Sequence, residues 1–203
     1  MGIDIDPLET IEELREDSAR DKRNERLNSF VAVTVAILAT FLGIFNVKDD
    51  NIVQAMLQEQ AHMIDYWNFY QARNIREEIA LATVEQISLA RSVRPEGERA
   101  AFDASLAKYQ ALAQSQNTKK EELKVQAEQA TANYDKLNYR DDQFDLSEAA
   151  MAIAIAMLAI TALTHIWWLY WLALVPSVFG LAIGLAGLFG LPFHPDFLIH
   201  PLT

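Results

Sequence analysis

Two long stretches without any charged side chain constrain the fold of this chain more than any other feature. Neither residues 27–47 nor residues 149–195 contain Asp, Glu, Lys or Arg. The hydrocarbon core of a bilayer is crossed by about 20 apolar residues in a helix. The first stretch therefore predicts one transmembrane helix at 27–47, and the second stretch is long enough for two such helices but not for three.

The remaining sequence is polar and acidic. Residues 1–26 and 48–148 hold all 17 Lys and Arg residues and 27 of the 28 Asp and Glu residues, within a formal net charge of −11. This balance argues against nucleic acid as a partner, because a phosphate backbone attracts clustered cations. It also argues against attachment to anionic lipid through a polybasic segment. Cysteine is absent, which excludes disulfides and thiolate-held metal sites.

The N-terminal segment 1–26 is predicted to form a short, polar amphipathic helix. Asp6 and Pro7 are a helix-start signal, since Asp can cap a helix and Pro suits its first position. The segment lacks the apolar region of a cleavable signal peptide. We therefore expect the transmembrane helix at 27–47 to act as an uncleaved signal anchor.

Residues 48–146 are expected to form a long antiparallel helical hairpin outside the membrane. Pro and Gly are absent from residues 49–92 and 98–148, whereas Pro95 and Gly97 lie between them. This pattern is typical of two long helices joined by a turn at about 92–98. Arms of about 44 residues would each extend roughly 65 Å, so that the chain returns to the membrane surface it left.

A heptad pattern marks the second arm of this predicted hairpin. Apolar residues recur at alternating spacings of four and three, interrupted only by Gln116 and Lys120, and this repeat predicts coiled-coil packing. The first arm has a broader apolar stripe that includes Trp67 and Tyr70, so we expect it to contact neighbouring subunits as well. The apolar heptad residues are Phe102, Leu106, Tyr109, Ala113, Leu123, Ala127, Ala130, Tyr134 and Leu137.

The second charge-free stretch predicts a transmembrane hairpin over residues 147–191. Asp145 to Glu148 provide a capping signal for its first helix, and Pro176 should lie near the first turn of its second helix. Aromatic residues from Trp167 to Trp171 indicate the turn, because Trp and Tyr collect at membrane interfaces. The predicted boundaries are about 147–165 and 170–191 for the helices and 192–203 for the C-terminal tail.

Small residues recur at spacings of three and four in the predicted transmembrane helices. Such faces let helix backbones approach closely in lipid, within or between subunits. We expect Val31, Val35, Leu38 and Leu42 to face lipid tails, and Ala152, Ala156, Ala159 and Ala162 to meet the glycine face of the last helix. The candidate packing residues are Ala32, Ala36, Ala39, Gly43, Gly180, Gly184 and Gly187, with Trp67, Tyr70, Leu123 and Tyr134 in the extramembrane hairpin.

Positive charge near the ends of the apolar stretches predicts the orientation. Five Lys and Arg residues lie between Arg15 and Arg26, whereas only Lys48 directly follows the first stretch. Cytoplasmic flanks of transmembrane helices are enriched in Lys and Arg. We therefore expect a cytoplasmic N-terminus, a periplasmic or otherwise extracytoplasmic hairpin, and a cytoplasmic aromatic turn.

Three segments of the first half carry a family resemblance. They are Glu25–Asn28 leading into Val33–Gly43, Val47–Met56, and Asp65–Arg73. They resemble the bacterial membrane protein family catalogued as domain of unknown function 4337, most closely over residues 22–90. The resemblance implies this helical layout and a bacterial inner membrane, and it supplies no catalytic residues. The last turn tends to be basic in that family, whereas Thr164–Ile166 has no permanent charge here.

Few residues suggest chemistry of their own. His62, His165, His194 and His200 lack the i, i+3 or i+4 histidine spacing of a zinc pair. His62 and Asp65 could form half of an intersubunit metal site, although an exposed helical pair is the commoner arrangement. His165 lies near membrane depth, where ionisable groups are often functional, but its Trp neighbours favour an ordinary interfacial histidine.

Two further groups of residues invite a ligand hypothesis. Asp141, Asp142, Asp145 and Glu148 could bind Ca²⁺, but they lack the spacing of an EF-hand, which favours helix capping and solvation. Trp67, Phe69 and Tyr70 could bind a ligand, although aromatic residues at helical spacing more often form a packing seam. We expect no catalytic residue, no cofactor and no metal ion.

The sequence thus predicts an all-α membrane protein that is not an enzyme. Its expected role is a self-associating structural or accessory subunit whose hairpin bundles outside the membrane. A component of a transporter or channel, and an accessory subunit of a larger membrane complex, are the alternatives. The expected partners are membrane lipid, further copies of the chain and, under the last alternative, another membrane protein complex.

Overall fold

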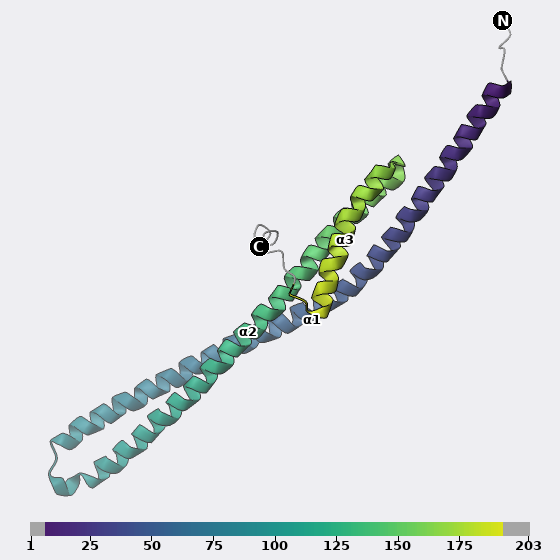
Figure 1. Ribbon diagram of the computed structural model, residues 1–203. Coiled ribbons are helices and arrows are strands. Elements are labelled where there is room, and N and C mark those ends of the chain that lie inside the picture. Colours follow the sequence, from purple (N-terminus) through teal and green to yellow (C-terminus); the bar gives the residue numbers. More distant parts are fainter. Residues whose placement is uncertain (1–6, 193–203) are drawn as a thin grey trace. The chain divides into compact units, whose positions relative to one another are not determined.

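The computed structural model describes residues 7–192, without the side chains of residues 7–11, 13 and 14, and this part of the chain is helical apart from short connections. Its elements are α1 (Pro7–Ser92), the short 3₁₀ helix η1 (Glu96–Glu98), α2 (Ala100–Thr164) and α3 (Trp167–Phe189) (Figure 1). No strand occurs among residues 7–192. The expected cap at Asp6, most of the C-terminal tail, His194 and His200 lie outside the described residues.

Helix α1 runs without a break through three segments that were expected as separate elements. Between Pro7, which opens the helix, and Ser92, the only further residue of the Pro or Gly type is Gly43. One glycine inside a helix costs about 1 kcal/mol relative to alanine, which is too little to end it. Helix α2 likewise passes straight through Asp145–Glu148, so these residues do not cap a new helix.

The three long helices contain the three expected apolar segments. Each of Arg15–Ser92, Ala100–Thr164 and Trp167–Phe189 is long and apolar enough to cross a membrane by length and composition. The chain divides into two compact units, which are described separately. Unit one comprises Met1–Ile52 with Tyr139–Thr203, and unit two comprises Val53–Asn138.

The interior of unit one consists of large apolar side chains from all three helices. Val31 and Leu38 of α1 are 5% and 1% exposed, so the expectation that they face lipid tails is wrong. The opposite face, formed by Ala32, Ala36, Ala39 and Gly43, is exposed within the chain. The larger side chains fill the space between helices, which small residues would leave empty. The fully buried large residues of this interior include Leu27, Phe45, Phe144, Met151, Leu158 and Ile183.

The connection between α2 and α3 is shorter than the sequence suggested. His165 adopts a left-handed backbone conformation with φ of 53°, and Ile166 is extended, so two residues reverse the chain. Because α3 already begins at Trp167, Pro176 lies inside the helix and not near its first turn. The helix ends in a left-handed Gly190, a common way to terminate an α-helix.

In unit two, segments of α1 and α2 lie side by side (Figure 1). All residues of the predicted heptad pattern, from Phe102 to Leu137, are buried or half-buried, and this includes the polar residues Gln116 and Lys120. On α1, Met56 and Ala80 are buried, and Met63, Tyr70, Val84 and Ile87 are half-buried. The heptad positions therefore form the packed face of α2 in this unit.

Candidate functional site

A polar layer lies within the packed face of unit two. The Lys120 ammonium lies 2.6 Å from a carboxylate oxygen of Glu77, and only 13% and 11% of these two side chains are exposed. Asn117 donates to Glu77 at 2.8 Å, and Lys120 donates to Asn74 at 3.2 Å. One helical turn away, Arg73 of α1 donates to Gln116 of α2 at 3.0 Å. The two residues that interrupt the heptad pattern thus have specific partners on the other helix.

The charges of this layer stabilise each other. Hydrogen bonds from Lys120 and Asn117 hold the pKa of the Glu77 carboxyl below its ordinary value of 4.5. The Glu77 carboxylate in turn raises the pKa of Lys120 above its ordinary value of 10.5. A paired polar group in an apolar seam disfavours any shift of one helix along the other, because a shift would bury the charges without partners. The layer therefore specifies register.

The remaining packing candidates of unit two lie on the side of this layer away from the turn. Trp67 and Tyr70 form an edge-on aromatic pair with ring centroids 5.4 Å apart, and Trp67 is more exposed than Tyr70. Leu123 and Tyr134 of α2 are half-buried. The ring centroids of His62 and Tyr66 are 6.1 Å apart. Among the described residues, no group of three or more His, Cys, Asp or Glu side chains could hold a metal ion.

A second polar feature is a pair of carboxyl groups in unit one. The Oδ1 atoms of Asp49 on α1 and Asp141 on α2 are both buried, and no donor group among the described residues reaches them. Burial, and then the nearby charge of Asp49, raise the pKa of Asp141 to about 7. Burial also raises the pKa of Asp49, and a hydrogen bond from Asp141 partly offsets this increase. The pair can share one proton near neutral pH.

The arginine that precedes Asp141 on α2 bonds elsewhere. Arg140 precedes Asp141 on α2, but its guanidinium donates two hydrogen bonds, of 3.2 and 3.0 Å, to the carbonyl oxygen of Gly187 on α3. It thereby satisfies a carbonyl group near the C-terminus of α3, where positive charge is favourable. Of the expected acidic cluster, Asp145 is more exposed than Asp141 and Asp142. No sequence pattern pointed to Asp49, which lies far from these residues along the chain.

The glycine face of α3 packs inside unit one. Gly180, Gly184 and Gly187 are all buried. A Cβ atom at Gly184 would meet the ring of Phe45 and, at 2.5 Å, the Ser147 hydroxyl, so the backbone approaches both side chains closely. Ser147 also donates to the Gly180 carbonyl oxygen at 2.7 Å.

The partners of this glycine face differ from those expected. Ala152, Ala156 and Ala159 are exposed and Ala162 is half-buried, whereas the buried face of α2 carries Gln143, Phe144, Ser147 and Met151. A Cβ atom at Gly180 would meet Met151, and one at Gly187 would meet Phe144 and Gln143. The expectation that the alanine face meets α3 is therefore wrong, because α2 turns its larger side chains toward the glycines.

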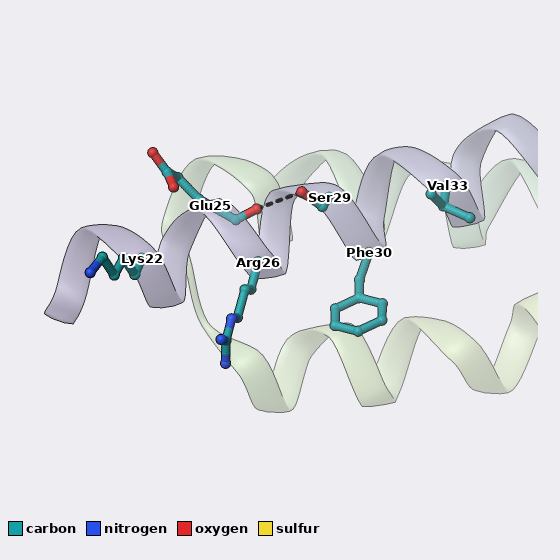
Figure 2. A pocket seen from close by; sticks show the side chains of 6 residues that line it. All are labelled: Lys22, Glu25, Arg26, Ser29, Phe30 and Val33. Carbon is teal, nitrogen blue, oxygen red and sulfur yellow. Dashed lines mark hydrogen bonds between the residues drawn. The ribbon is translucent and has the colours of Figure 1, made fainter.

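A basic hollow lies at the N-terminal end of the first apolar stretch. Lys22, Arg26 and Phe30 line two open hollows of about 440 and 550 Å³ in unit one, here together called the basic hollow. Figure 2 shows Arg26 and Phe30 on the same side of α1, both directed toward a neighbouring helix. Glu25, Ser29 and Val33 complete the lining of one hollow, and Ala19, Arg23 and Trp167 that of the other.

Comparisons with known proteins place the chain in a family. No curated protein and no solved structure matches it significantly. One family model matches residues 27–190, from the start of the first apolar stretch to the end of α3. This match covers most of the 203 residues. The chain therefore belongs to the family described as Domain of unknown function (DUF4337).

Proposed function

We propose that this chain is an integral membrane protein that self-associates and serves as a structural or accessory subunit. Three helical segments, at 27–47, 147–164 and 167–189, span the inner membrane of a bacterium. Unit two stands on the far side of the membrane from a cytoplasmic N-terminus, as an antiparallel coiled coil. It bundles there with further copies of the chain.

Exposed apolar side chains in unit one support the membrane location. Val33 of α1, Leu163 of α2 and Val175 of α3 are 60%, 83% and 66% exposed. Many exposed large apolar side chains on every helix are unusual for a protein in water, whereas lipid tails cover them without cost. The buried hydroxyls of Thr161 and Ser177 bond to carbonyl groups of their own helices, as expected where no water is present.

The contacts within unit two support the antiparallel hairpin. Close to the turn, Arg91 of α1 bonds to Asp103 of α2. Far from the turn, the Asn133 amide of α2 lies 3.5 Å from the Glu59 carboxylate of α1. The heptad positions of α2 provide the seam between them. A long seam with alternating spacings of three and four is the pattern of a coiled coil.

Self-association rests on one observation, the apolar stripe that α1 leaves exposed in unit two. Between Val53 and Ser92, nine large apolar side chains are exposed, whereas only Leu112 and Val125 are exposed between Ala100 and Asn138. Seven of the nine fall within about a third of the helix circumference. These seven residues, here called the α1 stripe, are Val53, Leu57, Ile64, Trp67, Ile75, Ile79 and Leu89.

A second copy of the chain is the occupant that fits the α1 stripe. The stripe faces away from the α2 seam and extends along most of α1 in this unit. The same stripe on a second copy offers a matching apolar surface of equal length, and paired identical surfaces are the commonest route to closed oligomers.

Native mass measurement of the protein in mild detergent tests this proposal. The wild-type chain should be an oligomer, and Ile64→Glu with Ile79→Glu should convert it to a monomer with unchanged helical content. Val125→Glu is the matched control, because Val125 is equally exposed but belongs to α2. A monomeric wild-type protein, or a double variant that still associates, would contradict self-association. Recovery of the chain from the soluble fraction without detergent would contradict the membrane location.

A further inference from the structure

Three cations at the basic hollow have no anionic partner within the described part of the chain. Lys22, Arg23 and Arg26 are exposed and form no ion pair there. Glu25, the one acidic residue in the lining, points away from Arg26 in Figure 2, and its carbonyl oxygen accepts a hydrogen bond from Ser29. The lining therefore has an excess of positive charge although the whole chain has a net charge of −11.

Aromatic side chains adjoin these cations. The Phe30 ring lies 6.1 Å from the Trp167 ring and 6.2 Å from the Tyr170 ring. Thr34 and Tyr170 share a hydrogen bond of 3.1 Å, which fixes the start of α3 beside the start of the first apolar stretch. Trp and Tyr settle at the level of lipid headgroups. The cations precede Phe30 on α1 by about one to two helical turns, on the side of Phe30 away from the rest of the apolar stretch.

The indole nitrogen of Trp167 adds an unsatisfied donor. Its Nε1 atom is buried and has no acceptor among the described residues. Buried donors are rarely left without an acceptor in a complete assembly. A ligand oxygen seated in the adjoining hollow, which Trp167 itself lines, would supply one after a small shift of the ring.

We propose that the basic hollow binds the phosphate headgroup of an anionic glycerophospholipid from the leaflet on the N-terminal side. Lys22, Arg23 and Arg26 contact the phosphate, and an acyl chain lies along Phe30 and Val33. This inference depends on the proposed membrane location. The bilayer supplies the occupant because the hollow opens where the charged part of α1 meets its apolar part, the level at which headgroup phosphates lie.

Lipid binding to the purified full-length protein tests the inference. Native mass spectra are recorded in mild detergent with added phosphatidylglycerol or, as the neutral comparison, phosphatidylcholine. The wild-type protein should retain phosphatidylglycerol selectively, and Lys22→Gln with Arg26→Gln should weaken its retention about tenfold or more. Inorganic phosphate at millimolar concentration should not displace the lipid, because it lacks the acyl chains that contact the apolar lining.

A matched variant separates a specific site from general charge. Arg15→Gln with Arg20→Gln removes the same charge from the same helix but no residue that lines the hollow. It should leave phosphatidylglycerol retention within about twofold of the wild type, since only nearby cations contact the phosphate. Equal loss in both double variants, equal retention of both lipids, or displacement by inorganic phosphate would overturn the inference. If the chain fractionates with membranes and yet shows one of these results, only the lipid site fails and the proposed function stands.

Discussion

The two units of this protein pack the same helices, α1 and α2, in different ways. In unit one the interior is mostly apolar, α3 approaches its neighbours through glycines, and the buried hydroxyl of Ser147 bonds to a carbonyl group. In unit two the seam follows heptads and contains the charged pair of Glu77 and Lys120. Unit one exposes apolar side chains on all three helices, whereas unit two exposes them mainly on α1.

Under the proposed membrane location, the surroundings of each unit account for this difference. In water, burial of apolar surface drives helices together, so a seam can include a charged pair that fixes register. In lipid that driving force is absent, and close contact between backbones has to hold the helices instead. On this proposal, the glycines of α3 hold helices together in lipid, and the charged layer between α1 and α2 fixes their register in water.

The strongest test of unit one is a larger side chain at its closest helix contact. Gly184→Leu would place atoms where the Phe45 ring and the Ser147 hydroxyl already lie. We expect a loss of about 3 kcal/mol or more, because overpacking forces helices apart. Thermal unfolding in detergent, followed by circular dichroism, measures it, and the milder Gly184→Ala keeps the test informative if the leucine variant does not fold.

Gly43 provides the matched control for this substitution. A Cβ atom at Gly43 would meet nothing within 4 Å inside the chain. Gly43→Leu should therefore leave the unfolding temperature of the chain close to that of the wild type. If oligomer mass falls while this temperature is unchanged, the exposed small-residue face of α1 is a contact between copies; equal destabilisation by both leucine variants would contradict the packing described for unit one.

In unit two, removal of one member of the charged layer should cost more than removal of both. Glu77→Leu leaves Lys120 in the seam without its carboxylate, and we expect the unfolding temperature to fall by several degrees. Glu77→Leu with Lys120→Leu should recover most of this loss, because paired apolar residues pack in the seam without a buried charge. Thermal unfolding measures the two single variants and the double variant. If the loss in the double variant equals the sum of the losses in Glu77→Leu and Lys120→Leu, the two charges do not interact.

The same pair predicts a pH dependence at both extremes. The folded protein holds the pKa of Glu77 below its ordinary value, so this stabilisation is present above about pH 4.5 and is lost as the pH falls through the folded pKa. The pKa of Lys120 is raised, so its contribution is present below about pH 10.5 and is lost as the pH rises through its folded pKa. The double leucine variant should lack both dependences.

The sequence predicted the helical content and the packed face of α2 because both follow from long repeats. A heptad pattern from Phe102 to Leu137, interrupted only by Gln116 and Lys120, predicts which side of the helix is packed. The sequence could not predict which side of α1 is buried in unit one. Lipid and protein interior are both apolar, so Val31 and Ala32 differ in size but hardly in hydrophobicity, and rotation about the helix axis has no sequence signal.

The candidate sites depended on contacts between distant parts of the chain. Asp49 meets Asp141 only because α1 and α2 align in unit one, and no local spacing contains this information. The basic hollow likewise could not be predicted from the sequence. The cations from Lys22 to Arg26 were visible in the sequence and indicated orientation, but their position beside Phe30 and Trp167 follows only from the packing of α1 against α3. Composition alone argued against a lipid contact that the local arrangement favours.

The carboxyl pair makes unit one sensitive to pH in the neutral range, in contrast to unit two. Since the pKa of Asp141 is raised from 3.8 to about 7, its contribution to stability is fully present below about pH 3.8 and is lost as the pH rises to about 7. Asp141→Asn, which resembles the protonated acid, should raise the unfolding temperature by a few degrees at pH 8 and by clearly less at pH 5. Asp65→Asn, at an exposed carboxylate of unit two, is the control; a wild-type unfolding temperature that is constant from pH 5 to 8 would contradict the shared proton.

The smallest expected effect concerns the second ion pair between α1 and α2 of unit two. Arg91 and Asp103 bond at 2.5 Å, as closely as Lys120 and Glu77, but 36% and 52% of their side chains are exposed. Water screens such a pair, so Asp103→Asn should cost only about 0.2–1 kcal/mol and should respond to added salt. Thermal unfolding at low and high salt, beside the Glu77→Leu variant, compares the two pairs. A loss as large as that of Glu77→Leu would mean that burial is not what distinguishes the polar layer, and that the turn itself holds the two helices in register.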